Sequence, residues 1–124
     1  MRRFLSICVL ACLAQACVTP SIPIPPPDPT EMSFHISVNG AVSEAVFQYP
    51  PTAAYVGGDA TVYNLAIGQG IIQHANTDGS IGPTLPLPAS AGDNIIVSVE
   101  NSKQTVSTCI VLREGAQDPT VYCQ

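Results

Sequence analysis

Apolar and polar residues alternate along two stretches of the chain, and alternation with a period of two is typical of half-buried β-strands. The first stretch is SFHISV, residues 33–38, in which Phe34, Ile36 and Val38 are predicted to face the interior. The second is NIIVSVE, residues 94–100, in which every second residue is again Ile or Val. Both stretches therefore predict strands with one buried face.

Weaker alternation predicts further short strands, and turn residues separate them. The additional candidates are residues 42–48, 60–67, 70–75, 81–87, 105–112 and 120–123. Gly, Pro, Asn and Asp gather between these segments, as in NTDGS and REGAQDP, and they favour turns. No stretch has a sustained apolar stripe of helical period, so the pattern predicts an all-β fold, a small antiparallel sandwich of about seven strands.

The composition limits this fold to one small domain. The chain has 124 residues, of which 46% are hydrophobic, and this is too apolar for a disordered chain. Charged residues are 10% of the chain, whereas about a quarter is usual for a soluble globular domain. The 12 prolines and 9 glycines favour strands, turns and linkers over helices.

The first residues of the chain have the three parts of an export signal. Arg2 and Arg3 form a basic start, residues 4–13 form an apolar core, and Ala14 and Ala16 are small residues near its end. The apolar run is shorter than the roughly 20 residues that a membrane-spanning helix needs. These residues therefore predict a signal peptide, residues 1–16.

The sequence LAQAC, residues 13–17, resembles the lipobox of bacterial lipoproteins. In that family the cysteine receives a diacylglyceryl group, the signal is cut just before it, and the new amino terminus is acylated. The resemblance implies that Cys17 is the lipidated residue, although Ala14 stands where the family prefers Leu. VLAC, ending at Cys12, is a rival lipobox, and an ordinary secretory signal with an incidental Cys17 is the alternative.

A proline-rich segment follows Cys17 and separates it from the predicted strands. Residues 20–29 contain six of the 12 prolines, which have no amide hydrogen and favour a solvated polyproline II form. At about 3.1 Å per residue, residues 18–31 could reach roughly 40 Å. We therefore expect residues 17–31 to be a lipidated tether and residues 32–124 the β-sandwich. The P-x-x-P spacing leaves open a ligand for an aromatic groove.

Two cysteines remain in the predicted domain. Cys109 and Cys123 are expected to form a disulfide, because an exported domain folds in an oxidising compartment. The bond would join the two strands of a final hairpin. The alternative is a redox-active pair. The two cysteines lack C-x-x-C spacing and both histidines are distant from them in sequence, which argues against that alternative.

The stretch NTDGSIGPTLPLPASAGDNIIVSV, residues 76–99, is similar to the late strands of bacterial Ig-like or carboxypeptidase-regulatory-like modules. The likeness lies in a polar turn, an LPLPA segment, a Gly-Asp turn and a β-branched strand. It implies an Ig-like or transthyretin-like sandwich that acts as an accessory module and has no catalytic centre.

Side chains that could carry chemistry are sparse. The sequence has no nucleophile-elbow, zinc-protease, phosphate-loop or dinucleotide motif, so we expect no catalytic residue, metal or cofactor. His35 and His74 are isolated in sequence and are interpreted as surface residues. Asp59, Asp78 and Asp93 lie in Gly-flanked turns, where a calcium site is an alternative to a simple turn.

Charge and aromatic content restrict the partners. Without residues 1–16, Lys103 and Arg113 stand against nine carboxylates, a net charge of −7, which disfavours nucleic acid and anionic lipid surfaces. The loop QYPPTAAYVGGDA carries Tyr49 and Tyr55 and is the candidate contact surface; the alternative is that both tyrosines pack into the core.

These features together predict a membrane-anchored lipoprotein whose sandwich is a non-catalytic binding or structural module of the bacterial cell envelope. We expect contact with the membrane through Cys17 and a further envelope protein as partner. Val18 rather than Asp follows Cys17, and in Gram-negative lipoproteins this favours the outer membrane. A small secreted or envelope hydrolase and a soluble secreted domain without lipid are the alternatives.

Overall fold

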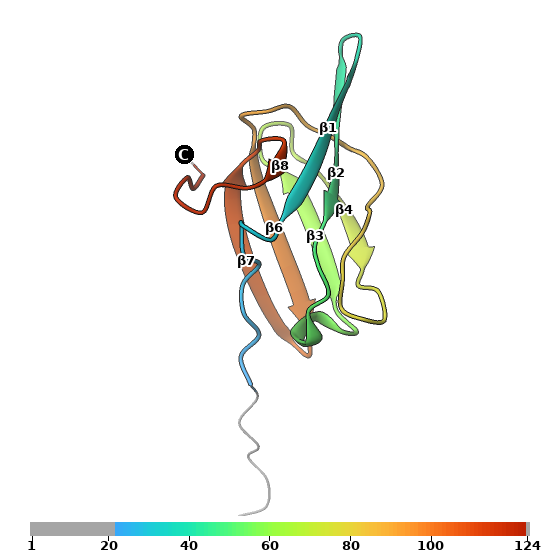
Figure 1. Ribbon diagram of the computed structural model, residues 1–124, viewed down its shortest axis with the longest axis vertical. Helices are drawn as coiled ribbons and strands as arrows, with labels where there is room; N and C mark the ends of the chain where they lie inside the picture. The colour runs from blue at the N-terminus through green and yellow to red at the C-terminus, as the bar shows by residue number, and fades with distance from the viewer. Residues whose placement is uncertain (1–21, 124) are drawn as a thin grey trace, which may run out of the picture.

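Two four-stranded antiparallel sheets face each other in the computed structural model, which describes residues 22–123 (Figure 1). The strands are β1 (Ser33–Asn39), β2 (Val42–Gln48), β3 (Asp59–Asn64), β4 (Gln69–His74), β5 (Leu87–Pro88), β6 (Asn94–Asn101), β7 (Gln104–Val111) and β8 (Gly115–Ala116). A 3-10 turn, η1 (Ala53–Tyr55), is the one helical element in this part of the chain. The predicted small antiparallel β-sandwich is confirmed.

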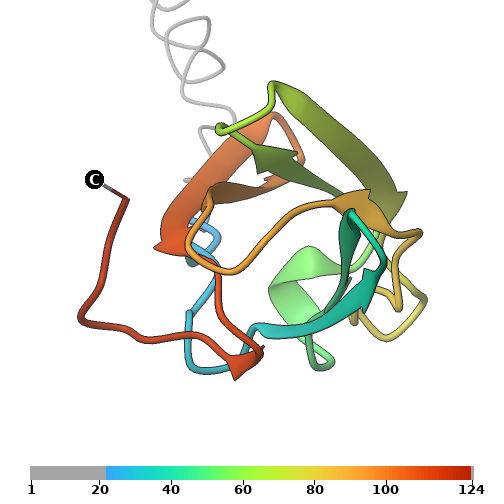
Figure 2. The ribbon, with the colours of Figure 1, turned by 90° about the horizontal axis from the view of Figure 1, so that it is seen from above.

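Each sheet joins strands that are distant in sequence. One sheet has the order β5-β2-β1-β8 and the other the order β4-β3-β6-β7. The view along the strands shows the two sheets as separate layers, with the chain crossing between them (Figure 2). The β5 and β8 strands are two residues each, so β1 and β2 form most of the first sheet.

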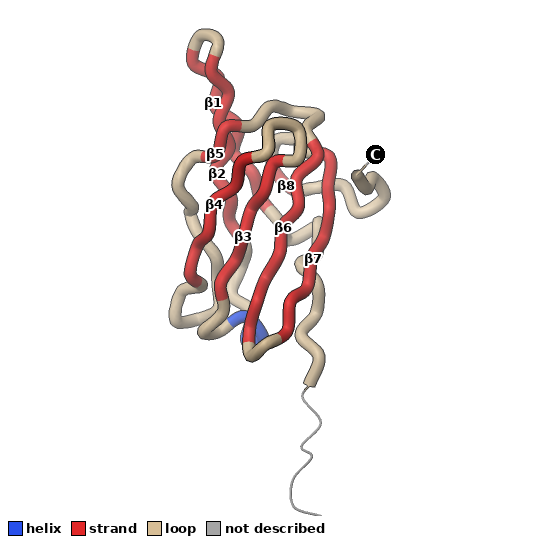
Figure 3. The backbone as a smooth tube through the Cα atoms, turned by 180° about the vertical axis from the view of Figure 1, so that it is seen from behind, coloured by secondary structure: helices blue, strands red, loops and turns tan. Residues whose placement is uncertain are grey.

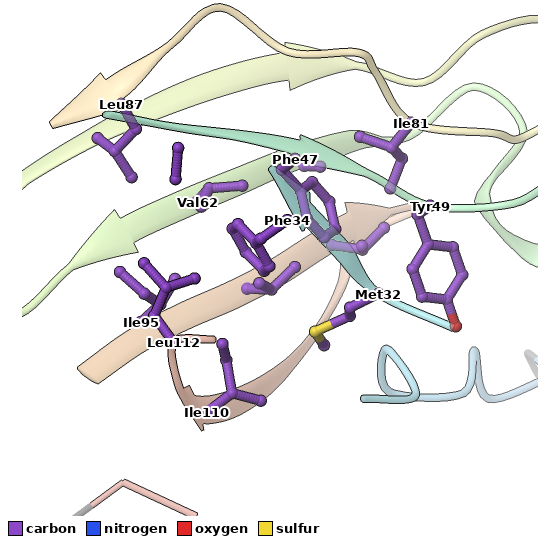
Figure 4. Packing of buried hydrophobic residues seen from close by; sticks show 14 of the residues in the cluster. Met32, Phe34, Phe47, Tyr49, Val62, Ile81, Leu87, Ile95, Ile110 and Leu112 are labelled. Carbon is purple, nitrogen blue, oxygen red and sulfur yellow. The ribbon is translucent and has the colours of Figure 1, made fainter. Parts of the chain in front are cut away.

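The inward faces of the two sheets form one hydrophobic core (Figure 4). From β6, Ile95, Val97 and Val99 are fully buried, as the alternation of that strand predicts. Opposite them, the rings of Phe34 and Phe47 have centroids 4.9 Å apart. The aromatic packing continues from Phe47 through Tyr49 to Tyr55, all from the β2 strand and the loop after it.

The tip of the β1–β2 hairpin extends past the opposite sheet (Figure 1). The prediction that Val38 faces the interior is wrong, because its side chain is 71% exposed. Ile36, two residues closer to the core, is partly buried, and Phe34 is fully buried. The alternation continues along the strand, but the second sheet ends before Val38, so no partner covers it.

The predicted strand 81–87 is an irregular segment. It follows the edge of β2 through the single Tyr49–Ile81 bridge and through a bond from the Thr84 amide to the Phe47 carbonyl, and regular pairing is confined to β5. Prolines at 83, 86 and 88 explain the difference, because a proline cannot donate to a ladder.

The predicted last strand, residues 120–123, is also different. Only one bridge, between Tyr122 and Ile110, joins it to β7. The chain first crosses to the other sheet, where β8 pairs with β1 through Gly115 and Phe34. The proposed final hairpin is therefore wrong, since REGAQDP, interpreted as a turn, contains a strand.

Candidate functional site

The chain contacts the sandwich from the first residue that the structure describes, and we call residues 22–29 the proline strap. Gln104, at the start of β7, bonds two backbone groups of the strap. Its Oε1 accepts from the Ile24 amide at 3.0 Å, and its Nε2 donates to the Ile22 carbonyl at 3.1 Å. The strap thus lies against β7. Residues 22–29 therefore do not lengthen the free spacer between Cys17 and the domain.

Prolines of the strap accept hydrogen bonds through their carbonyl oxygens and have no amide hydrogen to donate. The Tyr55 hydroxyl donates to the Pro25 carbonyl at 2.7 Å, and the Thr108 hydroxyl donates to the Pro27 carbonyl at 2.6 Å. Proline offers only its carbonyl oxygen, so side-chain hydroxyls of the domain are suitable partners. The strap is fixed by donors from η1 and from β7.

The two tyrosines of the predicted contact loop lie under this strap. Tyr49 is 6% exposed and Tyr55 is 0% exposed, with ring centroids 5.5 Å apart. The Tyr49 hydroxyl accepts a bond from the Asp28 amide at 3.0 Å. Burial is the main cause that raises the pKa of both phenols. They therefore form no exposed surface, and the alternative, packing in the core, is what the structure has.

Replacing Tyr55 with Phe tests the attachment of the strap. The variant keeps the ring and removes the donor to Pro25, so we expect a loss of about 1 kcal/mol in the free energy of unfolding. Faster amide exchange at Ile24 should accompany it. Tyr63→Phe, on the exposed sheet face, is the matched control; equal effects from both variants would contradict a role in holding the strap.

A shallow hollow lies beside Tyr49, with a volume of about 360 Å³. Its lining residues are Glu31, Ser33, Gln48, Tyr49, Pro50, Ser80, Ile81 and Gly82. These side chains offer one carboxylate and several hydrogen-bonding groups, but no histidine that could activate a serine hydroxyl. The hollow could bind a polar group, and its lining has no arranged nucleophile and base.

Both histidines lie on exposed strand faces, as predicted, and each pairs with a carboxylate. His74 Nδ1 is 2.7 Å from Asp59, and His35 Nδ1 is 2.9 Å from Glu114. The other oxygen of Glu114 accepts from the Ile36 amide at 2.6 Å. That amide, and secondarily His35, lowers the pKa of Glu114. The His35 pair lies on β1 and the His74 pair on β3 and β4, which belong to different sheets, so they form no common site.

The carboxylates of the acidic turns at Asp78 and Asp93 accept hydrogen bonds from the protein. Asp78 accepts from the amide and hydroxyl of Ser80, and these bonds lower the pKa of Asp78. Asp93 accepts from Asn64 Nδ2 at 2.9 Å and from the Ser90 amide at 2.9 Å. Within residues 22–123 there is no group of three His, Cys, Asp or Glu side chains that could hold a metal ion.

Cys109 and Cys123 form a disulfide, with a Cα–Cα distance of 5.4 Å, as predicted. Cys17 and the predicted signal peptide lie outside the described residues. None of the helical structure between residues 22 and 123 has the length and apolar character to cross a membrane.

The end of the sandwich opposite the strap carries exposed apolar side chains. Val38 and Val42 are exposed there on the β1–β2 hairpin, and Ile67 is 46% exposed in the β3–β4 turn. A groove of about 280 Å³ lies between Val42, Ile67 and the segment around Pro88.

Sequence reasoning missed this end and also missed the strap. The strap depends on Gln104 and Tyr55, whose side chains carry no pattern in the sequence that indicates a distant backbone partner. In comparisons with protein-family models, with curated proteins and with solved structures, no match to this chain was found.

Proposed function

We propose that this protein is a lipid-anchored protein of the bacterial cell envelope, and that its sandwich is a non-catalytic binding or structural module. The observation that carries the proposal is the position of Cys17. It ends an apolar run with a basic start, follows two small residues, and directly precedes the proline-rich segment. Lipidation at this cysteine would tether the domain to the membrane.

The strap supports a short tether. Four residues, 18–21, separate Cys17 from Ile22, whose carbonyl accepts a bond from Gln104 of β7. At about 3.1 Å per residue, these four residues could span roughly 12 Å. The domain would then stay near the bilayer, with the strap close to the lipid (Figure 1).

The charge of the domain supports attachment through lipid alone. Lys103 and Arg113 are its only cations against nine carboxylates, so anionic head groups repel it. Because Val18 follows Cys17, we propose the outer membrane as the location and a second envelope protein as a partner.

Substitution of Cys17 by Ala tests the anchor. We expect Cys17→Ala to abolish labelling by a radioactive or alkyne-tagged fatty acid and to move at least about tenfold more protein from the membrane to the soluble fraction, since acyl chains supply the membrane affinity. Cys12→Ala is the matched control and should remain lipidated and membrane-bound. Loss of label in the Cys12 variant alone would assign the anchor to the rival lipobox. Release of the wild-type chain without label would support the soluble secreted alternative.

A further inference from the structure

We propose that the free edge of β4 binds β4 of a second copy of this chain, so that two four-stranded sheets join into one antiparallel sheet. The proposal rests on how the four edges of the sandwich are covered and does not depend on the lipid anchor.

The edge of β7 is covered at both ends. The proline strap bonds Gln104 at its start, and Thr108 bonds the strap further along. At its other end, Ile110 bridges Tyr122. Proline-rich backbone cannot extend a ladder, so this edge is closed to a further strand.

Both edges of the β5-β2-β1-β8 sheet are also obstructed. The β5 strand is two residues long and ends in Pro88. The β8 strand is equally short, and beyond it the carboxylate of Glu114 accepts the outward amide of Ile36. Short strands, prolines and edge charges are the usual protections against strand addition.

The β4 strand has none of these protections. It pairs with β3 over six residues, and Figure 3 shows it as the outer strand of its sheet. Its sequence, QGIIQH, contains no proline, lysine, aspartate or glutamate. Ile72 on its outer face is 76% exposed. Long, uncharged edges with exposed apolar residues are the ones that accept further strands.

The pairing shows which backbone groups of β4 point away from β3. The Ala75 amide donates to Gly58, and backbone direction alternates along an antiparallel strand. The groups that face outward therefore belong to Gly70, Ile72 and His74. Within residues 22–123, no other strand pairs with them; the His74 carbonyl accepts a bond from the side-chain Nε2 of its neighbour Gln73 at 3.4 Å.

This edge is complementary to itself. An antiparallel register centred on Ile72 places Ile72 opposite Ile72 of the second copy and Gly70 opposite His74, so all three outward residues find a partner. The two exposed Ile72 side chains then cover each other. Glycine opposite His74 leaves room for the imidazole, which Asp59 already holds. Direct cross-strand contacts of this kind stabilise sheets.

A second copy suits the edge better than a charged partner strand. The six residues carry no fixed charge, and the net charge of −7 lies on other segments, so repulsion between copies should weaken as salt rises. A two-fold axis perpendicular to the joined sheet also leaves both strap ends free, at opposite ends of the dimer.

Cross-linking at the predicted two-fold axis tests the proposal in the full-length chain. Cα atoms of a hydrogen-bonded antiparallel pair lie about 5.5 Å apart, within the range of a disulfide. Mild oxidation of Ile72→Cys should therefore give a reducible dimer in at least about tenfold higher yield than Val38→Cys, the matched control on an equally exposed strand residue. Equal yields, or no dimer from either variant, would overturn the proposal.

A charge variant gives a second readout. Ile72→Lys should abolish chemical cross-linking of the otherwise wild-type chain, whereas Val38→Lys should leave it unchanged, because two lysines cannot share the axis. A cross-link from Ile72→Cys to a chain of different mass, in place of the dimer, would show that the edge binds another protein and would refute the second copy as occupant.

Discussion

Truncation of Phe47 to Ala is expected to lower the free energy of unfolding by about 3–5 kcal/mol. The Phe47 side chain is 1% exposed and lies centrally in the aromatic cluster, 4.9 Å from Phe34 and 6.5 Å from Tyr49 between ring centroids. Its removal leaves a cavity between the sheets that rigid β-strands cannot close. It also removes the neighbour that positions Tyr49, whose hydroxyl accepts from the strap.

Chemical denaturation followed by tyrosine fluorescence measures this loss. Phe47→Leu keeps most of the volume and should cost clearly less than Phe47→Ala. Val42→Ala, on the same strand at 55% exposure, should change the free energy of unfolding by less than about 0.5 kcal/mol. If Phe47→Ala cost no more than Val42→Ala, the placement of the core between the two sheets would be incorrect.

Several strands were predictable from the sequence, including two with weaker alternation. The prediction of residues 42–48 coincides with β2, and those of 94–100 and 105–112 match β6 and β7 within one residue. In β6 each inward side chain meets the opposite sheet, so burial and sequence pattern have the same period. Local information is sufficient there because one face of the strand is fully covered.

Three features depended on tertiary contacts and could not be predicted in this way. Val38 continues the pattern of β1, but nothing in the sequence indicates that the second sheet ends before it. Residues 81–87 have apolar alternation, which prolines override. The pairing of β8 with β1 joins residues about 80 apart in sequence, and a two-residue strand has too little pattern to reveal it.

The candidate contact loop was misjudged for a related reason. Proline and glycine around Tyr49 and Tyr55 indicate a loop, and loops are usually exposed. Here the proline strap covers both rings, and its contact with Gln104 and Thr108 brings together residues about 80 apart. Composition predicted that the proline strap is a spacer and that the loop with Tyr49 and Tyr55 is exposed. In the structure the strap covers both tyrosines.

Edge protection connects the strap with the proposed dimer. The same proline-rich residues that lead toward Cys17 close the edge of β7, while Glu114 closes the edge of β1. The other edges are protected, and the six residues of β4 are not. Another strand can therefore be added only at the β4 edge. The β4 edge is opposite the β7 edge that the strap covers.

Loss of the disulfide is expected to lower the free energy of unfolding by about 2–5 kcal/mol, with about 3 kcal/mol from the chain-entropy estimate for a loop of this size. Cys109 and Cys123 are 14 residues apart. Besides the disulfide, Tyr122 bridges Ile110 of β7, whereas Thr120 and Val121 bond the nearby Asp118, which forms an exposed ion pair with Arg113 at 3.8 Å. The bond therefore supplies most of the attachment of the chain end to β7.

Residues 113–117, which precede the chain end, are held by hydrogen bonds that do not depend on the disulfide. Amide exchange can therefore distinguish the two segments. The buried side chain of Gln117 donates to the carbonyls of Arg113 and Gly115 and accepts from the Arg113 amide. In the double variant Cys109→Ala and Cys123→Ala, amides of residues 120–123 should exchange rapidly, while those of Gly115 and Gln117 should stay protected in the folded state.

Peptide mapping verifies the bond before the variant is interpreted. Trypsin cleaves after Lys103 and Arg113, so each cysteine falls on its own peptide, residues 104–113 and 114–124. Without reduction the two peptides should elute as one species and separate only after reduction. Two separate peptides with alkylatable thiols would show that the bond is absent in solution and would favour the redox-active alternative. A bonded pair whose removal leaves the melting temperature unchanged would instead show that Gln117 and the Tyr122 bridge suffice to hold the chain end.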